Sequence, residues 1–176
     1  DRSSLFSKGN RNAWFPSVSL GWRVSEITVR GLSGKTIDKE RNEMKPEIVT
    51  LETSSLVLGF DRSSGSLVKL YSKASNWNVI KRPKLGLSWR MMLPLEGKRN
   101  NEAWGHKQPD APRCECTDER IVFTWDSITT EFGGKMDVKV TAECAVENDQ
   151  AVFRMHLSNR SGCLIENVYY PYIGDL

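Results

Sequence analysis

Strict alternation of apolar and polar side chains near the C-terminus constrains this chain more than any other feature. Apolar residues stand at every second position from Val138 to Val146, and again from Ala151 to Leu157. Successive side chains of a β-strand point to opposite faces of a sheet, so this spacing predicts two strands that each bury one face. The polar link Asn148-Asp149-Gln150 between them predicts a tight turn.

The segment 56–71 predicts a second pair of strands joined by a short turn. Leu58 and Phe60 share one side of the first run, as alternation in an extended chain requires. Asp61 can accept hydrogen bonds from the backbone of the turn, and Gly65 can take the positive φ that hairpin loops of this length commonly need. The segment is therefore predicted to form a β-hairpin.

Shorter apolar runs predict further strands, and hardly any helical pattern stands between them. These runs cover residues 48–52, 77–80, 87–93 and 121–125. The prolines, glycines and polar residues of segment 94–113 predict instead a long loop, of a kind that is often functional. Strands at this spacing, separated by turns, predict an all-β fold, an antiparallel β-sandwich.

The charge of the chain is uneven, and this argues against one class of partner. The formal net charge is +3. Residues 1–45 carry nine Lys and Arg against five Asp and Glu, whereas the rest of the chain carries 16 against 17. A nucleic-acid-binding domain concentrates its Lys and Arg on the folded part. Nucleic acid is therefore not predicted to be a partner.

The hydropathy of the chain predicts no membrane span. No apolar run approaches the roughly 18 to 20 residues that a membrane helix needs. The N-terminus also lacks the apolar core of a signal peptide. We expect neither a spanning helix nor a leader in this sequence.

Four cysteines stand in the chain, and their positions predict free thiols. Cys114 and Cys116 are one residue apart, closer than the two to four residues that separate paired zinc ligands. Cys144 falls on the apolar face of a predicted strand, and Cys163 lies near a turn. An oxidising compartment would permit one disulfide. No metal ion and no cofactor is predicted.

The segment around the predicted hairpin resembles a known family. Its sequence is LETSSLVLGFDRSSGSLVKLYSKASN, an apolar strand, an Asp-Arg-x-x-Gly turn and a Leu-containing strand. This pattern is similar to the opening of the galactose-mutarotase-like β-sandwich that precedes the catalytic domain in many bacterial glycoside hydrolases and polysaccharide lyases. The closing segment ENVYYPYIGDL resembles the Tyr-Pro-rich passage from such a sandwich to the next domain. The resemblance covers residues 46–176 and implies a truncated mutarotase-like sandwich whose parent protein continues into a catalytic domain.

The first 27 residues resemble a different family. LFSKGNRNAWFPSVSLGWRVSE is similar to a signature of the TonB-dependent outer-membrane transporters that import glycans in Bacteroidetes. The matching positions are Phe6, Asn10, Arg11, Phe15, Pro16, Ser17, Ser19, Gly21, Trp22 and Arg23. One strand of a barrel cannot satisfy its backbone groups in lipid by itself. We expect a transporter-like strand or tail at 1–27, a charged linker at 28–46 and the accessory β-sandwich at 47–176.

A tryptophan in the predicted long loop is the candidate for sugar binding. Trp104 stands near Asn100, Asn101, Glu102 and His106. A flat aromatic ring can stack on a sugar face, and polar neighbours can bind its hydroxyl groups. The alternative is that this tryptophan only pins the loop onto the sandwich. Three other tryptophans, at positions 77, 89 and 125, are predicted to lie in the core.

The tyrosines of the closing segment are candidates for a different role. Tyr169, Tyr170 and Tyr172 are predicted to anchor an interface with the catalytic domain that the resemblance implies.

Catalytic residues are not predicted in this chain. Glycoside hydrolysis usually needs a pair of carboxylates at a defined separation. The acids of the irregular regions are Glu102, Asp110, Glu115, Asp118 and Glu119. Nothing in their spacing selects a pair.

Three hypotheses follow for the function. The first is a non-catalytic accessory β-sandwich of a glycan-degrading glycoside hydrolase, with the catalytic domain absent from this chain. The second is a free-standing carbohydrate-binding module, and the third is a fragment with a purely structural or interaction role. The expected partners are a glycan or the missing catalytic domain, and the parent protein is expected in the periplasm or at the cell surface.

Overall fold

The computed structural model describes residues 47–174, so the segments predicted at 1–27 and 28–46 lie outside this range. Regular structure in the described part is almost entirely β, with two short 3-10 helices, η1 (Pro83–Leu85) and η2 (Gly105–Lys107). No helix found among these residues has the length and apolar character needed to cross a membrane. The strands pair antiparallel throughout, which confirms the predicted all-β fold class.

The first sheet contains the predicted hairpin. Its strands lie side by side in chain order: β1 (Ile48–Glu52), β2 (Leu56–Asp61), β3 (Ser66–Ser72) and β4 (Trp77–Asn78). In the turn between β2 and β3, the Asp61 side chain accepts a hydrogen bond from the backbone N–H of Ser63 at 2.8 Å. Gly65 has a φ of +65°. The two turn residues chosen from the sequence therefore close the hairpin, as predicted.

The longest strands belong to the second sheet. Its order in space is β12 (Gln150–Asn159), β11 (Val138–Glu147), β8 (Arg120–Trp125) and β7 (Arg113–Cys116). Every second residue of β11 from Val138 to Cys144 is buried, as the alternation predicts. The β11–β12 pairing has the predicted turn between its strands, with Asn148 and Asp149 at positive φ.

Two smaller sheets complete the described part. One contains β13 (Asn167–Tyr169), β5 (Arg90–Met92) and β6 (Glu102–Trp104), and the other is the hairpin of β9 (Ile128–Thr130) and β10 (Gly134–Met136). A bridge between Leu67 and Leu87 joins β3 to the segment that leads into β5. The backbone N–H of Glu131 donates to the backbone oxygen of Glu102 at 2.8 Å, which holds the end of β9 beside β6.

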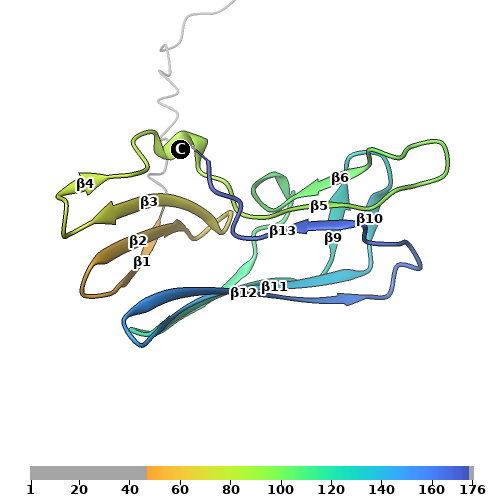
Figure 1. The fold of residues 1–176 in the computed structure, drawn as a ribbon. Coiled ribbons are helices and arrows are strands. Elements are labelled where there is room, and N and C mark those ends of the chain that lie inside the picture. The colour runs from red at the N-terminus through yellow and green to blue at the C-terminus, as the bar shows by residue number, and fades with distance from the viewer. Residues whose placement is uncertain (1–46, 175–176) are drawn as a thin grey trace, which may run out of the picture. The chain divides into compact units, whose positions relative to one another are not determined.

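The sheets form two layers around one core. Figure 1 shows β1–β4 and the sheet β13-β5-β6 in one layer, with β11 and β12 in the layer facing it. Aromatic pairs join the layers: Phe60 lies 5.9 Å from Phe123, and Trp89 lies 5.4 Å from Trp125 between ring centroids. The core is therefore the apolar interior of an antiparallel β-sandwich, the architecture that the alternation predicted.

One tryptophan was assigned to the wrong environment. Trp89 and Trp125 are buried, as predicted, but the Trp77 side chain is 53% exposed. Trp77 lies on β4, a two-residue strand at the edge of its sheet, where the Lys81 ammonium lies 4.1 Å from its ring centroid. Both residues of this short edge strand are exposed, so the apolar run around Trp77 did not indicate burial.

The segment 94–113 is also more ordered than predicted. It contains strand β6 and helix η2, and β6 pairs with β5 in register. Trp104 and His106 therefore lie on a strand and on a helical turn that the sandwich holds in place, rather than on a free loop.

Candidate functional site

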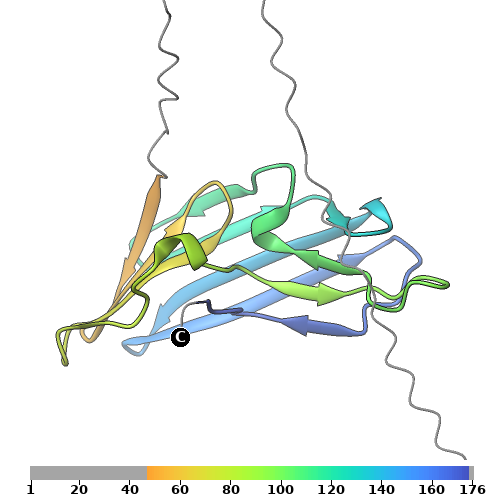
Figure 2. The same cartoon turned by 90° about the horizontal axis from the view of Figure 1, so that it is seen from above.

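A row of three large side chains crosses the outer face of the sheet β13-β5-β6. Strand pairing places Tyr169 opposite Arg90 and Arg90 opposite Trp104. The adjacent residues Met91 and Ala103 are fully buried in the core, so the alternate residues Arg90 and Trp104 point to the outer face. Figure 2 looks onto this layer from above.

The side chains of this row are in contact with one another. The Arg90 guanidinium carbon lies 4.9 Å from the Trp104 ring centroid and 5.6 Å from that of Tyr169. Tyr172 follows β13, and its ring centroid lies 5.7 Å from Trp104 and 6.1 Å from Tyr169. We call Trp104, Tyr169, Tyr172 and Arg90 the aromatic surface. The tryptophan predicted to bind sugar and two of the three tyrosines predicted at an interface thus lie on one surface.

Glu102 holds Arg90 in the middle of the aromatic surface. Both carboxylate oxygens of Glu102 accept hydrogen bonds from the guanidinium of Arg90, one of them from Nε at 3.0 Å. The pair is largely shielded, with the Glu102 side chain 15% exposed. Such a two-point contact fixes the orientation of the guanidinium plane as well as its charge. Glu102 therefore contributes to the surface by positioning Arg90.

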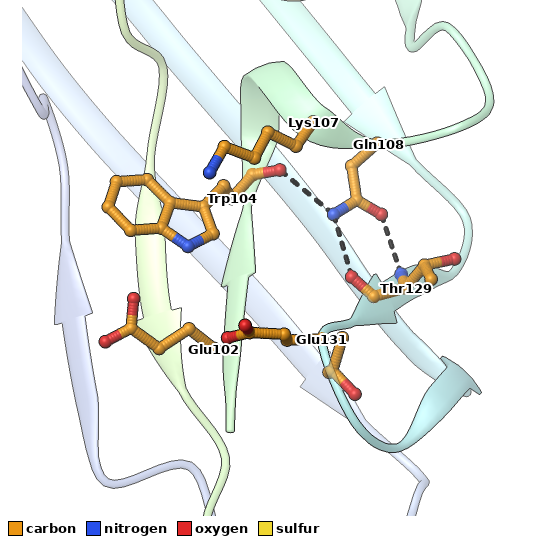
Figure 3. A pocket seen from close by; sticks show the side chains of 7 residues that line it. Glu102, Trp104, Lys107, Gln108, Thr129 and Glu131 are labelled. Atoms are coloured by element: carbon orange, nitrogen blue, oxygen red, sulfur yellow. Dashed lines mark hydrogen bonds between the residues drawn. The ribbon is translucent and has the colours of Figure 1, made fainter. Parts of the chain in front are cut away.

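A cavity of about 480 Å³ lies beside Trp104 (Figure 3). This volume is within the range of about 300–1,000 Å³ that is usual for small-molecule pockets. We call it the Trp104 cavity, and its lining is Glu102, Trp104, Lys107, Gln108, Thr129, Thr130 and Glu131.

Gln108 joins the two walls of the Trp104 cavity. Its Nε2 donates to the backbone oxygens of Trp104 at 3.0 Å and Thr129 at 3.1 Å. Its Oε1 accepts from the backbone N–H of Thr129 at 2.7 Å. Figure 3 shows these bonds crossing from the β6 side to β9. All three bonds are internal to the fold, so Gln108 fixes the shape of the cavity rather than facing a ligand.

Two exposed side chains of opposite charge, Lys107 and Glu131, line the cavity and can bind a ligand. The Lys107 ammonium lies 4.7 Å from the Trp104 ring centroid and is exposed. Glu131 is exposed as well, and within residues 47–174 its carboxylate takes part in no ion pair. Figure 3 shows the indole N–H of Trp104 directed to the side of the cavity where Glu102 and Glu131 lie. The cavity therefore offers the Lys107 ammonium as a hydrogen-bond donor on one side, and the indole N–H and a carboxylate acceptor on the other.

His106 contributes an uncharged ring next to the aromatic surface. Its ring packs edge-on against Trp104 at 5.6 Å between centroids. Burial lowers the pKa of His106, and the positive charge of Lys107 lowers it further. The imidazole is therefore uncharged at neutral pH. His106 is one of the residues predicted to lie near Trp104, and the structure places it in contact with that ring.

Asn101 does not belong to the candidate ligand-binding residues, which corrects one assignment. Its side chain is fully buried. Nδ2 donates to the backbone oxygen of Leu93 at 2.8 Å, and Oδ1 accepts from the backbone N–H of Phe132 at 2.9 Å. With both polar atoms used inside the fold, Asn101 links β6 to the β9–β10 turn. Asn100, by contrast, is exposed and lies before β6.

Tyr170 likewise differs from the two tyrosines with which it was grouped. It packs edge-on against Phe153 of β12 at 5.8 Å between centroids, and its hydroxyl donates to the backbone oxygen of Glu143 at 3.0 Å. Burial raises its pKa. Tyr170 thus connects the closing segment to the second sheet, while Tyr169, 46% exposed, and Tyr172 lie on the aromatic surface.

The acids considered for catalysis are distributed over several elements. Of the five, Glu102 alone lines the Trp104 cavity. Asp110 lies 3.9 Å from Lys135 in an exposed ion pair, Glu115 is on β7, and Asp118 and Glu119 are in the exposed turn before β8.

Sequence reasoning missed the residues that complete the site. Arg90, Lys107 and Glu131 were not singled out, because each is an ordinary charged residue in its local segment. Arg90 could have been found from the pairing of β5 with β6, since it is the polar residue between buried Trp89 and Met91. Glu131 has no such signal, because only the packing of the β9–β10 hairpin against β6 brings it to the cavity.

The described residues define a class of protein: an antiparallel β-sandwich that carries an aromatic, charged outer surface beside a small-molecule-sized cavity. No protein-family model matches the chain, and no curated protein matches it either.

Proposed function

We propose that this chain is a non-catalytic β-sandwich accessory domain of a glycan-degrading glycoside hydrolase and that it contacts glycan through the aromatic surface. In this proposal, catalysis belongs to a separate domain of the parent protein that is not part of this chain. The parent acts in the periplasm or at the cell surface, where its glycan substrates are found. The resemblance of residues 46–176 to the sandwich that precedes such catalytic domains supports the assignment to a glycan-degrading protein.

The observation that carries the proposal is the gathering of Trp104, Tyr169 and Tyr172 on one outer face. Aromatic rings on a protein surface bury the apolar faces of sugars, while neighbouring charged groups bind the hydroxyls. Lys107 and Glu131 lie beside Trp104, and their ammonium and carboxylate are charged groups of this kind. Trp104 and Tyr169 lie on paired strands, and the backbone N–H of Tyr172 donates to the backbone oxygen of Ser88 at 2.9 Å. The fold therefore positions all three rings before a ligand binds, which lowers the entropy cost of binding.

The state of Glu102 supports a non-catalytic role. A glycosidase needs one carboxyl group to deliver a proton and a second carboxylate at a set distance across the sugar. Both oxygens of Glu102 are occupied by Arg90. Glu102 therefore serves to position the guanidinium of Arg90 rather than to face a sugar.

Affinity electrophoresis in gels that contain soluble polysaccharides tests the proposal. We expect at least one polysaccharide to retard the chain, Trp104→Ala to abolish the retardation, and Trp77→Ala to leave it unchanged. Trp77 is the matched control, because it is an exposed tryptophan with a lysine over its ring on a different sheet. Retardation that survives in Trp104→Ala, or its absence with every polysaccharide, contradicts the proposed glycan contact. Release of reducing sugar by the purified chain contradicts the non-catalytic assignment.

The aromatic surface also favours the second candidate, a free-standing carbohydrate-binding module. The two candidates differ in whether the surface meets glycan alone or together with a catalytic domain. Attaching the chain to the hydrolase domain of its parent separates them. An accessory domain raises hydrolysis of soluble oligosaccharides, whereas an independent module raises hydrolysis of insoluble glycan alone.

A further inference from the structure

The aromatic surface is larger than one sugar ring. The ring centroids of Trp104, Tyr172 and Tyr169 follow one another at 5.7 and 6.1 Å. The Arg90 guanidinium carbon lies 4.9 Å from the Trp104 ring centroid and 5.6 Å from that of Tyr169, so Arg90 bridges the outer two rings. Successive rings of the row are tilted by 57° and 46°. Neighbouring strands lie about 4.8 Å apart, so the row from β13 to β6 spans about 10 Å. A surface of this extent accommodates successive sugars of a chain.

The Trp104 cavity continues the row at one end. Trp104 belongs both to the aromatic surface and to the cavity lining. The cavity walls beyond it come from η2 and the end of β9 (Figure 3). The end of β9 lies beside β6, whereas β13 lies across β5 from β6. A ligand that follows the surface from Tyr169 to Trp104 therefore reaches a cavity with different chemistry, where charged groups replace rings.

The cavity is suited to the hydroxyl groups of one sugar unit. A hydroxyl both donates and accepts hydrogen bonds. Neighbouring hydroxyls of one ring can therefore accept from the Lys107 ammonium and donate to the Glu131 carboxylate. Lys107 and Glu131 are both exposed and have freedom to adjust, whereas Gln108 and Glu102 are fixed by internal hydrogen bonds.

We propose that the ligand is a linear oligosaccharide of at least three units, which lies across strands β13, β5 and β6 with one unit in the Trp104 cavity and the following units on the aromatic surface. This inference rests on the proposed glycan contact and deepens it, because it assigns a length, a direction across the sheet and separate roles to the residues. The rings bind the successive units of a longer oligosaccharide, and the charged side chains of Lys107 and Glu131 recognise the one unit in the Trp104 cavity.

Calorimetric titration with an oligosaccharide ladder tests this arrangement. The probes are oligosaccharides of one to six units, made by partial hydrolysis of the polysaccharide that retards the chain most strongly. We expect affinity to rise from one unit to three, by roughly two- to tenfold for each ring engaged, and then to level off. The same affinity for one and for six units overturns the inference and leaves the proposed glycan contact standing. Failure of every polysaccharide to bind overturns both.

Variants separate the two parts of the site. Tyr169→Ala is expected to remove the gain from the longer oligosaccharides and to leave binding of the single sugar unchanged, while Tyr169→Phe retains the gain. Glu131→Gln is expected to weaken binding of every ladder member by the same factor, because all of them place a unit in the cavity. If Tyr169→Ala lowers the affinity for the single sugar and for the longer oligosaccharides by the same factor, the proposed placement of the first unit in the Trp104 cavity is contradicted. Trp77→Ala again serves as the control, and circular dichroism verifies that each variant is folded.

Discussion

At the scale of single residues, Asn101 fixes the geometry of the candidate site. Its amide bonds to the backbone of Leu93 and of Phe132 from a fully buried position. Asn101→Ala leaves two backbone groups without partners and opens a small cavity. We expect the variant to lose about 2–4 kcal/mol of unfolding free energy, measured by urea denaturation followed by circular dichroism.

The neighbouring residue provides a matched control for this prediction. Asn100 has the same side chain but is exposed. Asn100→Ala is expected to change the unfolding free energy by no more than about 0.5 kcal/mol. Similar losses in the two variants would show that the buried amide does not hold the β9–β10 turn.

The cysteines differ in exposure, which predicts a difference in reactivity. Cys144 is buried on β11, and burial raises its pKa to about 12, whereas Cys116 is exposed on β7. The thiolate is the reactive form, and Cys144 remains protonated at pH 8. Brief treatment with iodoacetamide at that pH, followed by mass spectrometry, should label Cys116 in the native protein and Cys144 after unfolding in urea. Equal labelling of both thiols in the native state would disprove this.

The limits of sequence reasoning at this scale are visible in pairs of like residues. Trp89 and Trp77 both stand in apolar runs, yet one is fully buried and the other 53% exposed. Asn100 and Asn101 are adjacent, but they face solvent and the fold interior respectively. Residue type and local pattern are almost the same within each pair. The neighbouring strand or turn decides the environment, and that neighbour is distant in the sequence.

At the scale of elements, the β2–β3 hairpin depends on the glycine in its turn. Gly65 has a φ of +65°, and a Cβ there would lie 2.8 Å from Cη2 of Trp125. Trp125 is buried in the core and cannot retreat. Gly65→Ala therefore combines backbone strain with a clash, and we expect a loss of about 2–4 kcal/mol in unfolding free energy.

Gly97 separates these two effects. It has a φ of +67°, but a Cβ there would meet nothing within 4 Å. Gly97→Ala is expected to lose about 1–2 kcal/mol, from the backbone alone. Urea denaturation of both variants measures the difference. Equal losses would mean that the contact of the hairpin with Trp125 contributes nothing.

The longer strands of the second sheet were predictable because apolar side chains stand at every second position. Strands β8 and β11 bury alternate residues in this way, and β12 has apolar residues at alternate positions from Ala151 to Leu157. Strand β6 has three residues, Glu102 to Trp104, which is too short for a periodic signal. Its partner β5 supplies the hydrogen bonds that define it. Strand β5 in turn pairs with β13, which lies more than sixty residues beyond β6 along the chain. Burial pattern therefore predicts long strands, whereas short ones follow from tertiary pairing.

At the scale of the whole described part, one contact joins the turns of the two layers. Asp149, between β11 and β12, accepts hydrogen bonds from the hydroxyl of Ser54 and from its backbone N–H, the latter at 2.6 Å. These bonds lower the pKa of Asp149 below its ordinary value. A carboxylate with a lowered folded-state pKa stabilises the fold above its ordinary pKa, and this contribution is lost as the pH falls through the lowered value.

The pH dependence of stability tests this contact. Asp149→Asn keeps the shape of the side chain and tolerates the positive φ of 62°. We expect the variant to be less stable than the parent at pH 7, and to lose less stability between about pH 5 and pH 2. Urea midpoints measured across this range provide the check. A parent and a variant with parallel pH profiles would contradict a role for the Asp149 charge.

The candidate site shows why the sandwich was predictable and its surface only in part. The fold follows from burial, which alternation records in each strand. The Trp104 cavity takes residues from β6, η2, β9 and the turn after β9. Trp104 was identified because a tryptophan is unusual in a polar segment, and Glu102 because it stands two residues before that tryptophan. Lys107 and Glu131 are common surface residues, and their proximity depends on how the β9–β10 hairpin packs against β6.

The distribution of the indole rings gives this protein an internal optical probe. The perpendicular pair Trp89 and Trp125 is shielded from water, while Trp77 and Trp104 face it. Emission from the shielded pair should shift to longer wavelengths when the layers separate. Changes confined to Trp104 should accompany ligand addition. Removing Trp77, together with Trp14 and Trp22 of the segment outside the described residues, leaves one chain whose fluorescence distinguishes unfolding from occupancy without any attached dye.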